Sequence, residues 1–200
     1  MALNFANNNS LSSITALPAS ISGGGLNLIS TQTASSSSTI SFTSGIDSTY
    51  KEYVFKFINI HPATDEAHFT VGFRDGGTDY DAVKTTTYIL SYHAEDDSEA
   101  TVGYNAASDL AQSSGFQRIL HGVGNGNDES ASGYLHLFDP SSTTFVKHFI
   151  AGGSSYNAGS YEYTTYVAGY NNVTAAIDGV QFKMSSGNID SGVIKLYGVS

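Results

Sequence analysis

The sequence predicts an all-β protein, a two-sheet antiparallel β-sandwich with jelly-roll-like connections. Short segments rich in β-branched and aromatic residues recur along the chain between Gly, Asn, Asp and Ser turns, as in a sandwich of about nine or ten strands. Charged residues make up only 13% of the chain, whereas Tyr and Phe occur 13 and 11 times. No helical pattern exceeds about two turns, and no internal repeat suggests a solenoid or a propeller.

Length and cysteine content limit the ways in which this chain can be stabilised. A chain of 200 residues fits one domain, or one domain with an arm. At this size a protein buries roughly 70% of its unfolded surface, so a core needs no disulfide or metal. The chain has no Cys, which excludes disulfides, thiolate metal sites and Cys nucleophiles.

The charge balance excludes some partners. The chain contains 8 Lys and Arg but 18 Asp and Glu, which gives a net charge of −10. Because this charge repels the phosphate backbone, we expect no direct nucleic-acid binding. The first ten residues, MALNFANNNS, lack the basic and apolar regions of a secretory signal, and no apolar window approaches the ~18 residues of a membrane helix. We therefore expect a soluble protein made in the cytoplasm, without membrane insertion.

Residues 1–37 are predicted to form an extended N-terminal docking arm, followed by the β-sandwich domain at 38–200. The arm contains scattered apolar residues that no helix or strand period joins, and it is interrupted by Gly23–Gly25 and by four serines, Ser35–Ser38. We expect it to lie along its own domain or along a neighbouring chain. The apolar residues predicted to dock are Leu3, Phe5, Leu11, Ile14 and Leu17.

The longest aromatic and β-branched run, Tyr50–Ile60, predicts the central strand of the protein. Within it Tyr53, Phe55 and Phe57 point to one face, while Val54, Lys56 and Ile58 point to the other. Because apolar residues occur on both faces, this strand is expected to be central and largely buried. A short strand at 40–43 precedes it, and Pro62 ends it because proline cannot donate to a ladder.

The remaining strands are expected where polar and apolar residues alternate or where apolar runs lie between turns. These segments are 67–73, 85–93, 116–121, 133–138, 144–150, 162–170, 175–184 and 192–198. A short helix is expected at 109–113, with Asp109 as its N-cap.

No motif for catalysis is evident, and we expect neither an enzyme nor a cofactor. The histidines are dispersed, without the spacing of a zinc motif, and no nucleophile-elbow or phosphate-loop pattern occurs. Glu52, Glu66 and Glu162 lie near predicted strands and are the carboxylates available for glycoside hydrolysis. A polysaccharide hydrolase or lyase is therefore kept as a third alternative.

Two loops are dense in oxygen ligands of the kind that calcium prefers. Asp75, Asp79 and Asp81 lie in DGGTDYD, and a second group lies at 125–129 in GNGNDES. Calcium takes six to eight oxygens, and neither loop matches the twelve-residue calcium-loop pattern. Ordinary turn chemistry explains both loops more simply, so the three aspartates are candidate cation ligands only.

A tyrosine-rich segment is the most suggestive binding surface in the sequence. Tyrosine combines a rigid ring for stacking with a hydroxyl for hydrogen bonding. We consider these side chains as a contact for a glycan or receptor, or alternatively as filling for the sandwich or for a subunit contact. They are Tyr156, Tyr161, Tyr163, Tyr166 and Tyr170.

Several segments, in order, resemble a family of small virion structural proteins from tailed phages of marine bacteria and cyanobacteria. They are STISFTSGIDSTYKEYVFKFINIHPATDE, KTTTYILSYHAEDDS, DLAQSSGFQ, GNGNDESASGYLHLFDPSSTTFVKHF, YVAGYNN and IDGVQFKMSSGNIDSGVIKLYGVS. The resemblance covers roughly residues 30–199. It implies capsid decoration proteins, head fibres or tail-fibre tips, and it brings no catalytic residues.

We therefore expect a non-enzymatic virion protein, made in the host cytoplasm, most consistent with capsid decoration or a head fibre and attached through its arm. The arm has no coiled-coil or β-helical shaft, so the domain is expected close to a particle surface or on another protein. The expected partners are other copies in a symmetric oligomer, with a trimer first, and a capsid or tail protein. A tail-associated receptor-binding module for host surface glycan is the alternative.

Overall fold

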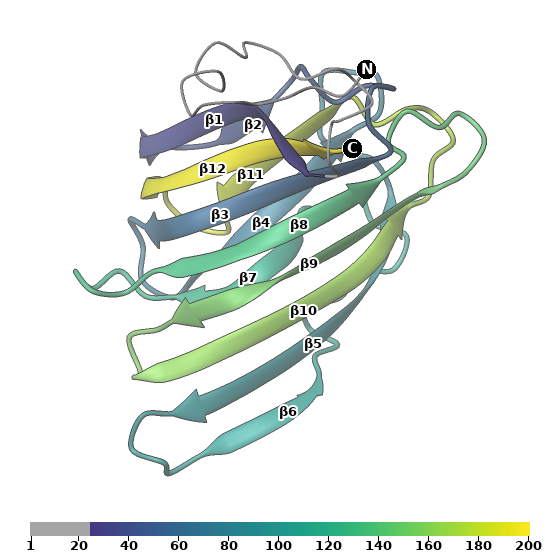
Figure 1. Cartoon of the computed structure of the whole chain (residues 1–200). Helices are drawn as coiled ribbons and strands as arrows, with labels where there is room; N and C mark the ends of the chain where they lie inside the picture. Colours follow the sequence, from purple (N-terminus) through teal and green to yellow (C-terminus); the bar gives the residue numbers. More distant parts are fainter. Residues whose placement is uncertain (1–24) are drawn as a thin grey trace, which may run out of the picture.

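The computed structural model describes residues 25–200 as an all-antiparallel sandwich of two sheets (Figure 1), which confirms the predicted fold class. The eight-stranded sheet contains, in spatial order, β1 (Leu26–Ser37), β12 (Ile189–Val199), β3 (Glu52–Pro62), β8 (Ala131–Phe138), β9 (Lys147–Tyr156), β10 (Tyr161–Asn171), β5 (Lys84–Ala94) and β6 (Ala100–Tyr104). The four-stranded sheet contains β2 (Ile40–Phe42), β11 (Gly179–Met184), β4 (Ala67–Arg74) and β7 (Gln117–Val123).

Eight of these strands form a jelly roll. Strands β1, β12, β3 and β8 face β2, β11, β4 and β7, which is the double-sheet arrangement of two interleaved Greek keys. The other four strands, β9, β10, β5 and β6, prolong the larger sheet beyond β8 and are called the extension here. As a result one sheet is twice as wide as its partner.

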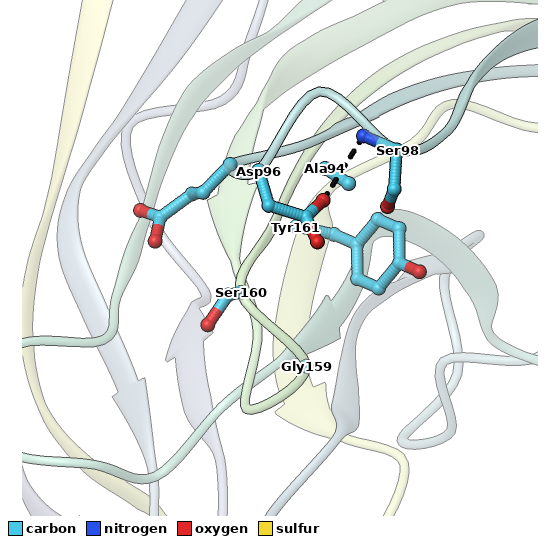
Figure 2. A pocket seen from close by; sticks show the side chains of 7 residues that line it. Ala94, Asp96, Ser98, Gly159, Ser160 and Tyr161 are labelled. Carbon is cyan, nitrogen blue, oxygen red and sulfur yellow. Dashed lines mark hydrogen bonds between the residues drawn. The ribbon is translucent and has the colours of Figure 1, made fainter.

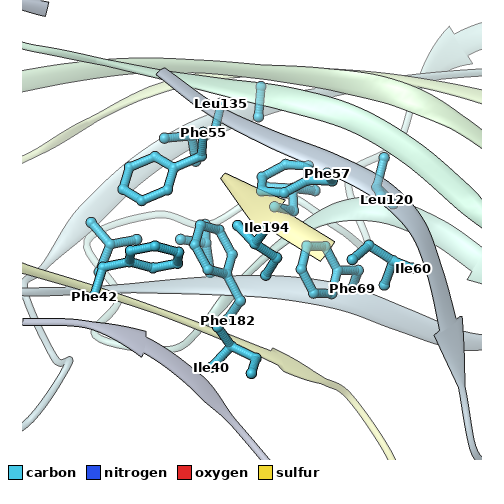
Figure 3. Packing of buried hydrophobic residues seen from close by; sticks show 14 of the residues in the cluster. Ile40, Phe42, Phe55, Phe57, Ile60, Phe69, Leu120, Leu135, Phe182 and Ile194 are labelled. Atoms are coloured by element: carbon cyan, nitrogen blue, oxygen red, sulfur yellow. The ribbon is translucent and has the colours of Figure 1, made fainter. Parts of the chain in front are cut away.

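Aromatic side chains hold the two sheets together (Figure 3). Phe182 on β11 stacks on Phe69 with ring centroids 5.5 Å apart, and it meets Phe55 and Phe57 of β3 edge-on at 5.3 and 5.1 Å. Phe42 packs on both Phe55 and Phe182. All five rings are buried. The alternation predicted for the central strand therefore places the core correctly.

The prediction that this strand is central and largely buried is confirmed, although its two faces differ. Strand β3 lies between β12 and β8, and Tyr53, Phe55 and Phe57 are buried. On the opposite face Val54 is buried as well, whereas Lys56 is exposed and Ile58 is 40% exposed. That face is the outer face of the eight-stranded sheet, turned away from the four-stranded sheet, and no second layer of the described residues covers it.

Residues 26–37 belong to the sandwich, so the predicted boundary between arm and domain at residue 37 is wrong. They form β1, which pairs with β12 along its whole length with one register shift after Leu28. Sequence periodicity missed this strand because it is rich in Ser and Thr, and Ala34 is its one buried residue. The residues predicted to dock, Leu3, Phe5, Leu11, Ile14 and Leu17, lie outside the described residues.

The helix predicted at 109–113 is also absent, because this segment is an extended cover over β5. Ser113 exchanges two backbone hydrogen bonds with Lys84 of β5, and the Leu110 carbonyl accepts one from the Thr86 N–H. The Leu110 N–H also donates to the Thr86 hydroxyl at 2.9 Å.

Residues 25–200 contain no helix long and apolar enough to cross a membrane.

A buried polar row ties loops to the extension. Lys84, Asn171 and Lys147 are direct neighbours across β5, β10 and β9, and all three are fully buried. The Lys84 ammonium donates to the Gly115 carbonyl at 2.8 Å, and the Lys147 ammonium donates to the Val173 carbonyl at 2.9 Å. Burial lowers the pKa of Lys84 to about 8, against the opposing effect of Asp81.

Substituting Phe182 with Ala should destabilise the protein by about 3–5 kcal/mol, because it removes the ring that contacts both sheets and leaves a cavity. The free energy of unfolding from urea denaturation measures this change. Phe145→Ala is the matched control, since that ring is 71% exposed and its loss should change stability by less than about 0.5 kcal/mol. Equal effects of the two substitutions would contradict this account of the core.

Candidate functional site

The outer face of the eight-stranded sheet carries nearly all the large apolar side chains that the described part of the chain exposes. Cross-strand registers place eight of these nine residues on this face, and the ninth, Phe145, lies in the β8–β9 loop. The eight are Leu26, Leu28, Ile58, Ile89, Val102, Tyr104, Tyr134 and Tyr166. An apolar surface gathered in this way marks a contact site on a soluble protein.

An aromatic row crosses the extension on this face. Tyr104 on β6 pairs with Ile89 on β5, Ile89 pairs with Tyr166 on β10, and Tyr166 pairs with Gly152 on β9. Gly152 in turn pairs with Tyr134 on β8. The four side chains are 57%, 42%, 44% and 37% exposed, in this order along the row. We call Tyr104, Ile89, Tyr166 and Tyr134 the aromatic row.

Glycine at position 152 allows the ring of Tyr134 to lie flat against the sheet. A Cβ atom placed on Gly152 would come within 3.0 Å of the Tyr134 hydroxyl and 3.2 Å of its ring carbon Cζ. At the other end of the row, the Tyr104 hydroxyl donates to the carboxylate of Asp109. Both contacts hold the outer tyrosines of the row in place.

A row of hydroxyl side chains runs parallel to the aromatic row and is offset from it by two residues on each strand. Ser91, Thr164, Ser154 and Ser132 are direct cross-strand neighbours on β5, β10, β9 and β8. The Glu162 carboxylate accepts hydrogen bonds from the hydroxyls of Ser154 and Thr164, both at 2.9 Å. We call these four residues the hydroxyl row.

The five tyrosines singled out in the sequence do not form one surface, so that part of the interpretation is wrong. Alternation along β10 places Tyr166 and Tyr170 on the outer face but Tyr161 and Tyr163 on the inner face. Tyr156 lines a hollow beside the hydroxyl row, together with Ser132, Ser154 and Glu162. Tyr104 and Tyr134 were missed because only the register brings them level with Tyr166.

The two inner tyrosines belong to an aromatic cluster at the end of the core. Tyr92 of β5 meets Tyr161 and Tyr163 edge-on, with centroids 5.6 and 5.7 Å apart. The Tyr92 hydroxyl donates to Glu99 at 2.7 Å, and Tyr163 packs edge-on against His121 of β7. This arrangement fills the space between the extension and β7.

A hollow next to this cluster separates the β5–β6 and β9–β10 turns (Figure 2). The Ser98 N–H donates to the Asp96 carboxylate at 3.0 Å, and the Glu95 N–H donates to the Ser160 carbonyl at 3.0 Å. These bonds satisfy turn backbone groups. Tyr161 supplies the one aromatic ring lining the hollow.

The aspartates considered as cation ligands do not assemble into a metal site. Within residues 25–200 no group of three or more His, Asp or Glu side chains is placed to hold a metal ion. Asp81 and Asp75 instead act electrostatically on the buried ammoniums of Lys84 and Lys147. Asp79 lies exposed in the turn between them.

The carboxylates considered for hydrolysis are not brought together either. Glu52 on β3 and Glu162 on β10 are three strands apart and lie at opposite ends of the outer face. Glu52 contacts the His136 imidazole at 2.5 Å, and Glu66 accepts from Asn157 at 3.3 Å. Paired hydrolytic carboxylates stand about 5–10 Å apart, so Glu52 and Glu162 cannot act as such a pair.

Two half-buried histidines form a pair beside the aromatic cluster. The rings of His68 and His121 lie 4.7 Å apart, and the Gly122 N–H donates to His68 Nδ1 at 2.9 Å. Burial, with added repulsion from His121 and Arg118, lowers the pKa of His68 to about 4. Burial and Arg118 lower the pKa of His121. The pair is therefore neutral in the folded protein at pH 7.

Comparisons with protein-family models, with curated proteins and with solved structures found no match.

Acidification from pH 7 to pH 5 should destabilise the fold, because the unfolded chain binds a proton at His68 near pH 6.5 and the folded chain near pH 4. Stability therefore rises with pH across this window. The contribution of His68 is on the order of 1 kcal/mol after allowance for partial exposure. Urea midpoints at both pH values measure it.

His68→Gln should reduce this pH dependence, because an amide side chain does not titrate. The amide oxygen can still accept the hydrogen bond from the Gly122 N–H, so this contact is kept. The control is His93→Gln, because His93 is exposed and its ion-pair partner is Asp97, four residues along the chain in the β5–β6 turn. An unchanged pH dependence in His68→Gln would show that the His68 imidazole does not cause it.

Proposed function

We propose that this chain is a non-enzymatic structural protein of a bacteriophage particle, of the capsid-decoration or head-fibre kind. The observation that carries the proposal is the outer face of the eight-stranded sheet, where eight exposed apolar and aromatic side chains are distributed over β1, β3, β8, β10, β5 and β6. The resemblance to small virion proteins supports the same assignment. In this proposal the sandwich stands on the particle surface as a symmetric oligomer and presents its outer face to the surroundings.

In this proposal the chain is attached at one edge of the large sheet and presents the aromatic row toward the other edge. Strand β1 begins at Leu26 on one edge, and the extension ends with β6 on the opposite edge (Figure 1). The described part of the chain therefore begins at the edge of the sheet away from the aromatic row. We propose that the apolar residues before Leu26 hold a capsid protein or a neighbouring copy.

A second candidate is a receptor-binding module on the tail. The observation that favours it is the aromatic row with its adjacent hydroxyl row, because stacking rings and hydroxyl groups side by side suit a carbohydrate. The two candidates differ in where the protein lies on the particle, and location is therefore the property to measure.

Electron microscopy of intact particles labelled with a Fab against residues 38–200 locates the protein. Label distributed over the head is the expected result and supports decoration. Label confined to the tail end would favour the receptor-binding candidate. Particles without label, prepared from a host that produces the chain, would contradict both.

Polar substitutions in the arm should prevent incorporation into particles. For the double variant Leu11→Asp, Ile14→Asp in the full chain, we expect at least a tenfold loss of particle-bound protein, measured by quantitative immunoblot of purified particles. Its urea midpoint should stay at the parent value, which distinguishes lost docking from unfolding. Phe145→Ala is the control for an exposed apolar residue elsewhere. Incorporation at the parent level would show that these residues do not dock the protein.

A further inference from the structure

We infer that the aromatic row is the binding site for a neutral, linear polysaccharide whose extended chain lies across the strands of the extension. The inference rests on the proposed display of the outer face on a particle, and it names the class of ligand that this face holds. The contact residues are Tyr104, Tyr166 and Tyr134 as stacking rings, with Ile89 between the first two.

The spacing of the tyrosines carries the argument. Neighbouring strands lie about 4.8 Å apart, so residues in register on alternate strands lie about 10 Å apart. Tyr104, Tyr166 and Tyr134 occupy β6, β10 and β8, which are alternate strands, in one continuous register. This backbone interval is comparable to one disaccharide unit of an extended chain with equatorial linkages, in which alternate rings turn the same face toward the protein. The Tyr134 ring leans over Gly152 and so lies closer to Tyr166 than its own backbone does.

The platform is open and shallow, as a long chain requires. Gly152 lies between Tyr166 and Tyr134, and the ring of Tyr134 covers it instead of projecting away from the sheet. Val102, 73% exposed, continues the apolar surface beside Tyr104 at the edge of the sheet. Strand β6 has only β5 as a neighbour, so nothing within residues 25–200 closes that end of the platform.

The hydroxyl row supplies the polar half of the site. Thr164, Ser154 and Ser132 are exposed beside the row, and the Glu162 carboxylate orients the first two by accepting hydrogen bonds from their hydroxyls. Each hydroxyl oxygen keeps a free lone pair toward solvent that can accept from a sugar hydroxyl. Stacking along one line with hydrogen bonds along a parallel line is the chemistry of a pyranose chain, which is apolar on its ring faces and polar at its edges.

The charges of this surface favour a neutral polysaccharide. The row and the hydroxyl row contain no cation, and the charged groups next to them are Glu162, Asp109 at the Tyr104 hydroxyl and, beyond Tyr134, Lys56. The chain as a whole carries a net charge of −10, which repels anionic polysaccharides at low ionic strength.

A second protein surface fits this region less well than a sugar chain does. Three of the five exposed aliphatic residues of the outer face, Leu26, Leu28 and Ile58, lie on β1 and β3 at the other side of the sheet, whereas Ile89 and Val102 lie on β5 and β6 of the extension. The extension instead combines tyrosines with an uninterrupted line of hydroxyls, which leaves a protein partner little aliphatic surface to bury.

The test is isothermal titration calorimetry of the full chain with three hexasaccharides. Cellohexaose and chitohexaose present straight ribbons with equatorial linkages, whereas maltohexaose coils. We expect binding of one or both straight oligosaccharides and at least tenfold weaker binding of maltohexaose. Tyr104→Ala and Tyr166→Ala should each weaken binding at least tenfold.

Tyr170→Ala is the matched control, because Tyr170 lies on the same strand and the same face as Tyr166 but outside the row. Its affinity should stay within twofold of the parent. Absence of binding to all three sugars would overturn the inference, as would equal binding of maltohexaose or equal effects of the Tyr166 and Tyr170 substitutions.

Light scattering on the same samples tests the other occupant of the face, a second copy of the chain. An oligomer that dissociates in Ile89→Lys, while the parent binds no sugar, would assign the platform to self-association and overturn the inference. The location of the protein on particles is measured independently, so a protein found in virions that binds no sugar leaves the proposed function standing.

Discussion

Aromatic packing between the two sheets is the interaction on which the rest of this structure depends. Phe182 contacts Phe42, Phe55, Phe57 and Phe69, so one ring joins three strands of the small sheet to the centre of the large one. Rings with tilted or edge-on contacts fill the roughly 10 Å between packed sheets without polar atoms. A chain without Cys and with few charges can hold a sandwich of this size by burial alone.

The width of the large sheet follows from two insertions into the jelly roll. Strands β5 and β6 are inserted between β4 and β7, and β9 and β10 between β8 and β11. The small sheet does not reach over all of these strands, so other groups cover their inner face. The segment 105–116, the buried ammoniums of Lys84 and Lys147, and the Tyr92 cluster have this role. The outer face remains open for contacts.

This division gives the outer face a regular arrangement of side chains. Within residues 25–200 acidic and imidazole side chains take part in turns, in loop contacts and in the His68–His121 pair, and no three of them are placed to hold a metal ion. The exposed rings, by contrast, lie in one register on one flat face. Regular pairing in a wide sheet spaces side chains evenly, which suits a repeating ligand better than a single reacting atom.

The sequence by itself determined the fold class, the central strand and the core, because period-two alternation such as Phe55–Phe57 is a local property of the chain. It could not reveal β1, whose Ser and Thr residues pair with β12 from the far end of the chain. Alternation within the predicted strand 162–170 separates Tyr166 from Tyr163, but the sequence could not join Tyr104 to Tyr134. Only the tertiary structure decided which tyrosines share a surface, because cross-strand register relates residues that are distant in sequence.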